Sequence, residues 1–228
     1  MASVTIAPLL PYLALRRGML ISMLRTVAIG FVVFMVVGNV AILFASAVAK
    51  WAATDGDSLS GVKNFMVVDD TLWRSGAPTE AGYESLVEAG VATIVDLRAE
   101  EGLEVPTEML AASGVEFRPI PIRDGQTPTE DQVREFLGAV GDSSGPVLVH
   151  CGAGVGRTGA MVAAYLAATD QGSGADRVRH NLTAGPPSLE QIAYAARLDG
   201  DFDRPNVALV AASRLLDAPR RIFHRIGL

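Results

Sequence analysis

The sequence is poor in cysteine, because Cys151 is the single cysteine among 228 residues. One cysteine cannot form a disulfide within the chain, so cysteine content does not indicate an oxidising or a reducing compartment. Histidine is also scarce, and His150, His180 and His224 lack the paired spacing of metal ligands. We therefore expect no metal and no other cofactor.

Positive charge is also in short supply. The 19 lysine and arginine residues are outnumbered by 25 aspartate and glutamate residues, for a formal net charge of -6. Non-specific binding of nucleic acid requires a broad basic surface, so we expect no nucleic-acid partner. Hydrophobic residues make up 50% of the chain, which is enough for one domain with a full core and a short extension.

A stretch without any charged residue runs from Thr26 to Ala49. As a helix it would rise roughly 36 Å, whereas the hydrocarbon core of a bilayer is about 30 Å thick. Three arginines precede the stretch, and Lys50 alone follows it closely. The excess of positive charge on the N-terminal side predicts a cytoplasmic N-terminus. We expect a single-pass membrane helix, a membrane as partner, and an extracytoplasmic location for the rest of the chain.

Two other interpretations of this stretch are a buried core helix and a signal peptide. A core helix is rarely apolar around its whole circumference. The small residues at 45–47 and 47–49 resemble a cleavage pattern, but the apolar run is longer than the roughly 7–15 residues usual in a signal peptide. We favour an uncleaved anchor at 26–49, which follows a tail at 1–25 and precedes a linker at 50–61.

Short β-rich runs alternate with helical patterns beyond residue 62. This alternation predicts an α/β fold, in which a mainly parallel sheet is flanked by helices. We expect that domain at 62–200 and an amphipathic helical extension with a basic end at 201–228. The expected strands are 65–68, 93–97, 117–122 and 147–150, and the expected helices are 79–89, 106–113, 129–140 and 158–169.

The most informative segment runs from Val147 to Gly159, where an apolar strand leads through a glycine-rich loop into an alanine-rich helix. Five residues, three of them glycine, separate Cys151 from Arg157. The backbone N–H groups of such a loop can surround one point at the helix N-terminus and bind a tetrahedral dianion. The residues expected to bind this phosphate are Gly152, Ala153, Gly154, Val155, Gly156 and Arg157.

Three side chains of this segment are suited to catalysis. The positive field of the loop stabilises the thiolate form of Cys151 and so makes it a nucleophile. Arg157 carries a planar guanidinium that can hold two phosphate oxygens and stabilise charge in the transition state. The hydroxyl of Thr158 can donate a hydrogen bond to the sulfur when the sulfur becomes the leaving group.

The ten residues from His150 to Gly159 resemble the signature of the protein tyrosine phosphatase superfamily, which is His-Cys, five residues, Arg, then Ser or Thr. The compact domain and the segments at 72–78 and 93–98 look like those of the dual-specificity branch in its bacterial, fungal and plant forms. The resemblance covers roughly residues 65–195. It implies hydrolysis of phosphate monoesters on tyrosine, serine or threonine through a phosphocysteine intermediate, in a phosphorylated protein or small molecule.

This mechanism implies an acid on a loop before the nucleophile, and we expect Asp124 to be that acid. It follows an expected strand and precedes an expected helix. Its carboxyl group would protonate the leaving alcohol and then activate the water that hydrolyses the intermediate. The alternative is that Asp124 only shapes a turn beside Gly125. The nearest substitutes are Glu130, Asp131 and Asp142.

Other polar residues near these segments receive lesser roles. We expect His150 to orient the loop and tune the thiolate rather than act as a base. Gln191 invites comparison with the glutamine that positions water in tyrosine-specific members, but its surroundings do not match, and we leave it out. For Asp96 and Arg98, at the end of a strand, a structural ion pair is the better interpretation.

Several other functions stay open. Compact relatives of the dual-specificity branch act on phosphoinositides or inositol pyrophosphates, and a catalytically silent domain could bind phosphate without turnover. Rhodanese-like sulfurtransferases and arsenate reductases share the spacing of Cys151 and Arg157. The glycine-rich loop between His150 and Thr158 favours a phosphatase over these.

Overall fold

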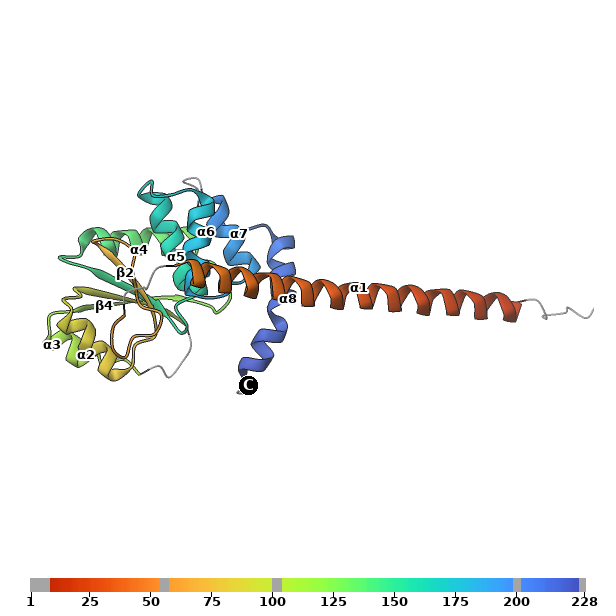
Figure 1. The fold of residues 1–228 in the computed structure, drawn as a ribbon, viewed down its shortest axis with the longest axis horizontal. Coiled ribbons are helices and arrows are strands. Elements are labelled where there is room, and N and C mark those ends of the chain that lie inside the picture. The colour runs from red at the N-terminus through yellow and green to blue at the C-terminus, as the bar shows by residue number, and fades with distance from the viewer. Residues whose placement is uncertain (1–8, 54–57, 100–103, 199–201, 226–228) are drawn as a thin grey trace, which may run out of the picture. The chain divides into compact units, whose positions relative to one another are not determined.

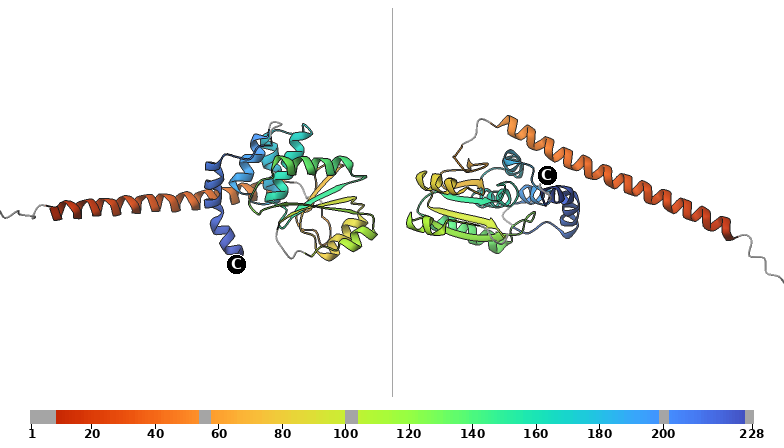
Figure 2. Two further views of the ribbon diagram at one scale, coloured as in Figure 1. Left: turned by 180° about the vertical axis from the view of Figure 1, so that it is seen from behind. Right: turned by 90° about the horizontal axis from the view of Figure 1, so that it is seen from below.

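The computed structural model describes residues 9–53, 58–99, 104–198 and 202–225 (Figures 1 and 2). The chain divides into two compact units, Met1–Ala41 and Ile42–Leu228. The described part of the first unit is helical, and the second unit holds the sheet.

Helix α1, Leu9–Ala52, supplies the described part of the first unit and the start of the second. It is longer than the expected membrane helix at 26–49, because it also takes in most of the expected tail at 1–25. Pro11 is the third residue of α1, where a backbone N–H has no acceptor within the helix, so its absence costs no hydrogen bond. Residues 1–8 of that tail lie outside the described residues.

Polar side chains in the apolar part of α1 bond to the helix itself. The Thr26 hydroxyl donates to the carbonyl of Ser22 at 3.1 Å, and the Asn39 side-chain amide donates to the carbonyl of Met35 at 2.9 Å. Such bonds satisfy polar side chains within the helix that carries them. Among the described residues, one helical stretch, Arg16–Ala52, is long and apolar enough to cross a membrane, and a signal sequence has the same character.

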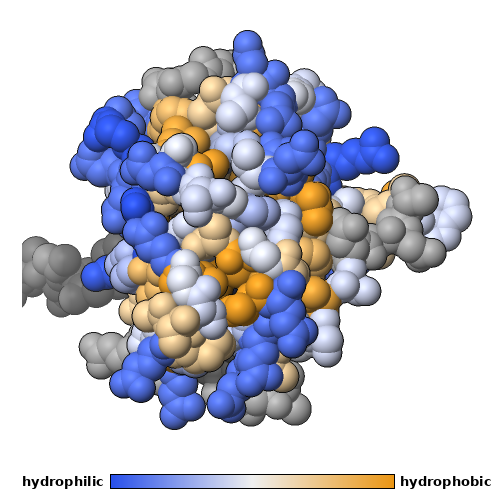
Figure 3. All heavy atoms as spheres, turned by 90° about the vertical axis from the view of Figure 1, so that its left-hand side faces the viewer, coloured by the Kyte–Doolittle hydropathy of each residue, from blue (hydrophilic) through white to orange (hydrophobic). Residues whose placement is uncertain are grey.

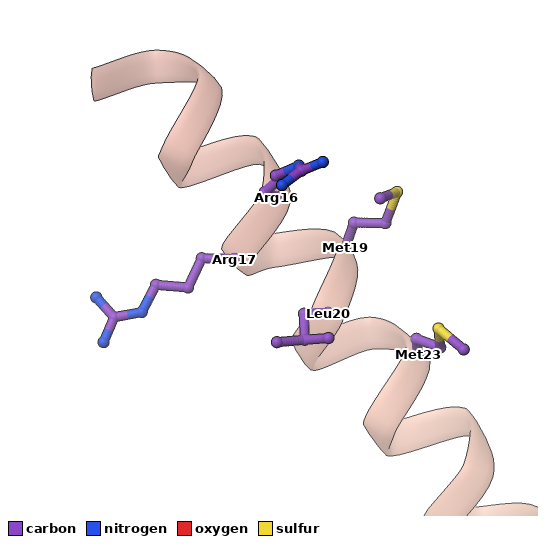
Figure 4. A pocket seen from close by; sticks show the side chains of 5 residues that line it. All are labelled: Arg16, Arg17, Met19, Leu20 and Met23. Carbon is purple, nitrogen blue, oxygen red and sulfur yellow. The ribbon is translucent and has the colours of Figure 1, made fainter. Parts of the chain in front are cut away.

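A shallow hollow on α1 is lined by Arg16, Arg17, Met19, Leu20 and Met23. In the close view, Arg17 points away from Met19 and Met23 (Figure 4). One helix provides no opposite wall, so these side chains do not enclose a ligand. We assign no binding site to this hollow.

The last turns of α1, from Ile42 on, belong to the second unit. Ser46 is buried there, and its hydroxyl donates to the carbonyl of Leu182 at 2.9 Å, as a buried hydroxyl requires. The structure therefore differs from the expected division into a helix that ends at 49 and a linker at 50–61. Helix α1 continues to Ala52, three residues beyond the expected end. Residues 54–57 of that linker lie outside the described residues.

Five strands form one sheet in the order β1-β2-β5-β3-β4. Strands β2, β5, β3 and β4 run parallel, and β1 is antiparallel to β2 at one edge. The expected α/β fold with a mainly parallel sheet is thereby confirmed. The strands are β1 Met66–Val67, β2 Leu72–Gly76, β3 Thr93–Arg98, β4 Glu116–Ile122 and β5 Val147–Cys151.

Helices cover both faces of this sheet (Figure 1). Helices α2 and α3 lie on one face, and α4 and α5 lie on the other, where α6 and α7 pack against α5. The sequence patterns indicated four of these six helices but left the region of α6 and α7 unassigned. The bounds are α2 Glu80–Glu88, α3 Thr107–Ala112, α4 Glu130–Asp142, α5 Gly156–Ala168, α6 Gly174–Ala184, α7 Leu189–Arg197 and α8 Val207–Arg225, the last within the expected extension at 201–228.

The two core clusters follow from the alternation of side chains along the central strands. Ile94 and Leu148 pack with the cluster under α2 and α3, whereas Val95 and Val149 pack with the cluster under α4 and α5. Figure 3 shows one face of the outside, where hydrophilic residues border small hydrophobic patches. Because the strands are parallel, their carboxyl ends meet at one edge, where Gly76 pairs with Cys151.

Candidate active site

The loop between β5 and α5 begins directly after Cys151 and lies against the end of β2. Gly154 has a φ of +73°, and a Cβ there would overlap the backbone of Ser75 and Gly76. Glycine alone combines this conformation with so close an approach. The glycine spacing of the sequence is therefore explained by the contact between the loop and β2.

Three successive carbonyl groups of this loop accept hydrogen bonds from donors outside it. The pairs are Ala77 N–H to the Gly152 carbonyl at 3.0 Å, Asn64 Nδ2 to the Ala153 carbonyl at 2.8 Å, and Arg74 Nη2 to the Gly154 carbonyl at 2.7 Å. In a trans peptide the N–H points opposite to the carbonyl. The N–H groups of residues 153–155 therefore point away from these donors, and none of them donates to an acceptor in the described part of the chain. Unpaired N–H groups in sequence form an anion-binding nest.

The N-terminus of α5 adds to this nest. Its N-cap residue, Val155, has no side-chain acceptor. By contrast, the N-cap side chains of α2, α4, α6 and α7 each accept a backbone N–H; these residues are Thr79, Thr129, Ser173 and Ser188. The first N–H groups and the positive end of the α5 dipole are thus left for an anion.

The structure places Asp124 beside Arg157, at the far end of the loop that begins after Cys151. Cys151 is 2% exposed and Arg157 is 5% exposed. The guanidinium of Arg157 donates from Nη1 to the Ile122 carbonyl at 3.3 Å, and its Nη2 lies 3.4 Å from Oδ1 of Asp124. The side chain of Asp124 is 69% exposed, so it reaches the loop from the solvent side.

The alternative carboxylates lie elsewhere. Glu130 and Asp131 pair with Arg134 on the exposed surface of α4, at 2.8 and 2.7 Å. Asp142 is the exposed last residue of α4. Asp124 is thus the candidate acid that contacts the arginine of the loop.

Thr158 lies in the first turn of α5 and is fully buried. Its hydroxyl has no hydrogen-bond partner among the described residues. A buried hydroxyl without a partner is costly, and such groups recur at reactive sites. The described part of the structure contains no hydrogen bond from Thr158 to Cys151, and the expected bond to a leaving sulfur stays a prediction.

His150 is fully buried beside Cys151, and its ring meets the ring of Tyr83 edge to face at 6.3 Å. Burial lowers the pKa of His150 to about 4, although Asp96, 3.8 Å from Nδ1, opposes this shift. The imidazole is therefore uncharged at neutral pH and cannot stabilise a thiolate as a cation. Asp96 forms the expected ion pair with Arg98, at 2.7 Å.

A cavity of about 210 Å³ opens beside the loop. Its walls come from four parts of the fold: the segment after β4, the Cys151 loop, the start of α7, and α8. The lining residues are Asp124, Gly125, Ala153, Val155, Gly156, Pro186, Pro187, Ser188, Gln191 and Asp217.

A family model described as "DSP-PTPase phosphatase fused to NAD+ Kinase" matches residues 44–197, about two thirds of the chain. The chain belongs to this phosphatase family. The matched stretch contains the whole Cys151 loop and begins within α1, in agreement with the second unit of the structure. The resemblance to the compact dual-specificity branch of the protein tyrosine phosphatase superfamily is confirmed.

Relatives with different activities share this phosphatase domain. NAD kinase 2, chloroplastic, of Arabidopsis thaliana is 37% identical over 100 residues, which are 41% of this chain and 10% of that protein. Inositol diphosphatase DSP4 of the same plant is 31% identical over 104 residues, 43% of this chain and 52% of that protein. The chain therefore spans about a tenth of the plant kinase and about half of DSP4.

The fold of the phosphatase family is also found among solved structures. PTPMT1 in complex with PI(5)P superimposes with a TM-score of 0.52 at 18% identity, over 59% of this chain and 94% of that chain. At this identity the likeness establishes the fold.

Arg74 is a residue of the phosphatase site to which the sequence analysis assigned no role. It is fully buried in the middle of β2, and beyond its bond to Gly154 it donates from Nη1 to Oδ1 of Asn181 at 3.3 Å. Burial lowers its pKa to about 10, against the attraction of Cys151, so it stays charged at neutral pH. Among the described residues no carboxylate pairs with it. A buried cation of this kind is costly unless an anion compensates it, which the thiolate and a phosphate on the loop would do.

Gln191, which the sequence analysis left out, lines the cavity of the phosphatase site. Its amide packs so closely on the loop that a Cβ at Gly156 would lie 2.6 Å from it. Its Nε2 also donates to the Gln126 carbonyl at 3.3 Å. The local sequence around Gln191 gave no sign of this, because the contact depends on how α7 packs against α5. Asp217 of α8 was missed for the same reason.

Proposed function

We propose that this chain hydrolyses phosphate monoesters through a phosphocysteine intermediate. The Cys151 thiolate attacks phosphorus, so that the S–P bond forms as the ester P–O bond breaks, and Asp124 gives its proton to the leaving alcohol. Asp124 then takes a proton from water, which attacks phosphorus and releases inorganic phosphate and the thiolate. Arg157 and the loop N–H groups hold the phosphoryl oxygens.

The main support for this proposal is that the carbonyls of Gly152, Ala153 and Gly154 accept hydrogen bonds from donors outside the loop. These bonds leave the N–H groups of residues 153–155 without an acceptor in the described part of the chain, between a buried cysteine and a buried arginine. A silent binding domain needs a nest of this kind but needs neither Cys151 nor an acid beside Arg157. The presence of both supports turnover rather than binding alone.

For the substrate, we propose a molecule with a single phosphate, on tyrosine, serine or threonine of a protein. The described residues that line the cavity include Asp124 and Asp217 and no lysine or arginine. A ligand with several phosphates needs several cations around it. Pro186 and Pro187 provide an apolar wall suited to a peptide or an aromatic ring. Hydrolysis of phosphoinositides or inositol pyrophosphates is the second candidate, favoured by the name of the relative DSP4.

A substrate panel tests this proposal. The full chain in a non-ionic detergent, with EDTA present, is given phosphotyrosine, phosphoserine and phosphothreonine peptides, a phosphatidylinositol monophosphate, and an inositol pyrophosphate. We expect kcat/KM to be at least about tenfold higher for one of the phosphopeptides, which corresponds to about 1.4 kcal/mol of discrimination. A preference for the inositol pyrophosphate would establish the second candidate, and vanadate binding without any turnover would indicate a silent domain.

We also propose that α1 anchors the chain as a single membrane span with the phosphatase domain outside the cytoplasm. Support comes from the apolar character of Arg16–Ala52 and from the arginines on its N-terminal side. We expect the chain to stay in the membrane fraction at alkaline pH and to be digested by a protease added outside intact cells. Release at alkaline pH, or protection from the protease, would contradict the anchor or the orientation respectively.

A further inference from the structure

A buried carboxylate of helix α7 accepts hydrogen bonds from the segment that carries Asp124. Thr127, three residues after Asp124, is fully buried, and Glu190 in the first turn of α7 is 2% exposed. Oε1 of Glu190 accepts both the N–H and the hydroxyl of Thr127, at 3.3 and 3.2 Å. The segment is thus tied to α7 through a side chain 63 positions further along the chain.

The residues on either side of Thr127 are held in the same way. Gln191 donates to the carbonyl of Gln126 at 3.3 Å. Arg204, between α7 and α8, donates to the carbonyl of Thr127 at 2.9 Å and to that of Pro128 at 3.4 Å. Three successive carbonyls, at residues 126–128, therefore accept bonds from side chains of residues 191 and 204.

Helix α7 is itself fixed at the point where it holds this segment. Ser188 and Gln191 form a reciprocal capping box at its N-terminus. The backbone N–H of Glu190 donates to Oγ of Ser213 in α8 at 2.9 Å, and that hydroxyl donates to Asp217 at 3.2 Å. The backbone that carries Glu190 is therefore fixed on both sides, by the capping box and by α8.

The position of Asp124 depends on this attachment. Its side chain is 69% exposed and makes a 3.4 Å contact with Arg157, so little packing holds the carboxyl group itself. A buried carboxylate such as Glu190 costs free energy unless it is well hydrogen-bonded. If the segment formed only a turn, it would not need a buried carboxylate to hold it. A general acid, by contrast, must be placed to within about 0.5 Å.

We infer that Glu190 is a positioning residue for the general acid Asp124, and that Arg204 assists it. This inference rests on the proposed function, in which Asp124 protonates the leaving group. A correctly placed acid matters most when the leaving alcohol is a poor leaving group, and least when it leaves without a proton. A residue needed only for folding would lower the rate for both kinds of substrate alike.

The test compares phenyl phosphate, with a poor leaving group, and 2,4-dinitrophenyl phosphate, with a good one. The full chain in detergent is assayed beside Glu190→Ala, Glu190→Gln and Asp124→Asn. The quantity compared is kcat/KM, which reports the steps up to cleavage of the ester P–O bond and excludes the later step in which Asp124 activates water. We expect Glu190→Ala to lower kcat/KM for phenyl phosphate roughly tenfold or more, since a displacement of about 1 Å costs up to 10²-fold, and to leave kcat/KM for 2,4-dinitrophenyl phosphate within about threefold. Glu190→Gln keeps an acceptor for both donors of Thr127 and should restore most of the loss.

Two further variants keep the result decisive. Arg204 is exposed, so Arg204→Ala is expected to fold and to show a smaller loss of the same selective kind; it decides the matter if Glu190→Ala does not fold. Glu84→Ala, on the exposed face of α2, is the matched control and should leave both rates unchanged.

Equal losses on both substrates, or no loss, would overturn the role of Glu190. A failure of Asp124→Asn to show the selective loss would instead overturn the acid itself, and no turnover by the unchanged chain would overturn the proposed function.

Discussion

Replacing Cys151 with serine is expected to abolish turnover while the loop still binds inorganic phosphate. We expect kcat to fall by a factor of roughly 10⁴ or more, in the range seen when a nucleophile is removed from other hydrolases. The reason is that a serine hydroxyl keeps its proton in a site that stabilises an ionised sulfur. The loop N–H groups and Arg157 do not depend on the sulfur, so phosphate binding measured by calorimetry should change little.

The single cysteine makes this prediction easy to control. Because Cys151 is the single cysteine of the 228-residue sequence, alkylation by iodoacetamide can modify one thiol alone. Inactivation of the unchanged chain should follow that modification and should be slowed by inorganic phosphate. A Cys151→Ser variant that keeps more than about a tenth of the rate would show that the nucleophile is another group.

Replacing Asp124 with asparagine is expected to cause the second largest loss. The amide has nearly the same shape but cannot supply a proton, so kcat for a poor leaving group should fall by roughly 10²–10⁴-fold. The 3.4 Å contact places Asp124 next to Arg157, the side chain proposed to hold the phosphate. The measurement is kcat for phenyl phosphate over a range of pH, where the limb that reports a protonated acid should disappear.

The matched control is Asp131→Asn, which changes a carboxylate of the neighbouring helix α4. Asp131 is 90% exposed at its side chain and pairs with Arg134, so its replacement should leave kcat unchanged. If Asp131→Asn gave the large loss and Asp124→Asn did not, Asp124 would be only a turn residue beside Gly125.

The parts of the site that could be predicted from the sequence are those whose residues are close in the chain. The strand, the loop and the helix that carry Cys151 and Arg157 are continuous, and glycine spacing reports the shape of the loop. The starts of α2 and α4 were also predicted, because Thr79 and Thr129 precede acidic first turns and do act as caps. Each of these signals is local, and no tertiary contact is needed to interpret it.

The residues that were missed act across long separations in the chain. Arg74 lies 80 positions before Gly154, whose carbonyl it binds, and Glu190 lies 63 positions after Thr127. Strand β2 was overlooked because Arg74 and Ser75 are buried there and interrupt the apolar pattern expected of a buried strand. The available signal was a charged residue, Arg74, in a short run of β-forming residues. Its role could not be predicted, because that role depends on the contact with the Cys151 loop.

The limits of α1 illustrate a different obstacle. Hydropathy detects the apolar stretch but not where its helix ends, because helix formation continues through any residue that does not break it. Pro11 is tolerated in the first turn, and at the other end the helix runs past the expected limit at 49 to Ala52. The sequence therefore indicates the apolar residues of α1, whereas the helix itself extends beyond both limits of that stretch, to Leu9 and Ala52.

The anchored carbonyls of the Cys151 loop have a thermodynamic consequence. A loop that had to close around its ligand would lose conformational entropy at each binding event, roughly 1–2 kcal/mol per residue ordered. Here the bonds from Ala77, Asn64 and Arg74 order the loop when the chain folds. The entropy is lost once, during folding, so an incoming phosphate meets a preorganised cradle and its affinity is not reduced by that loss. The charge of Arg157 and hydrogen bonds from N–H groups that are already in place would then hold the phosphate.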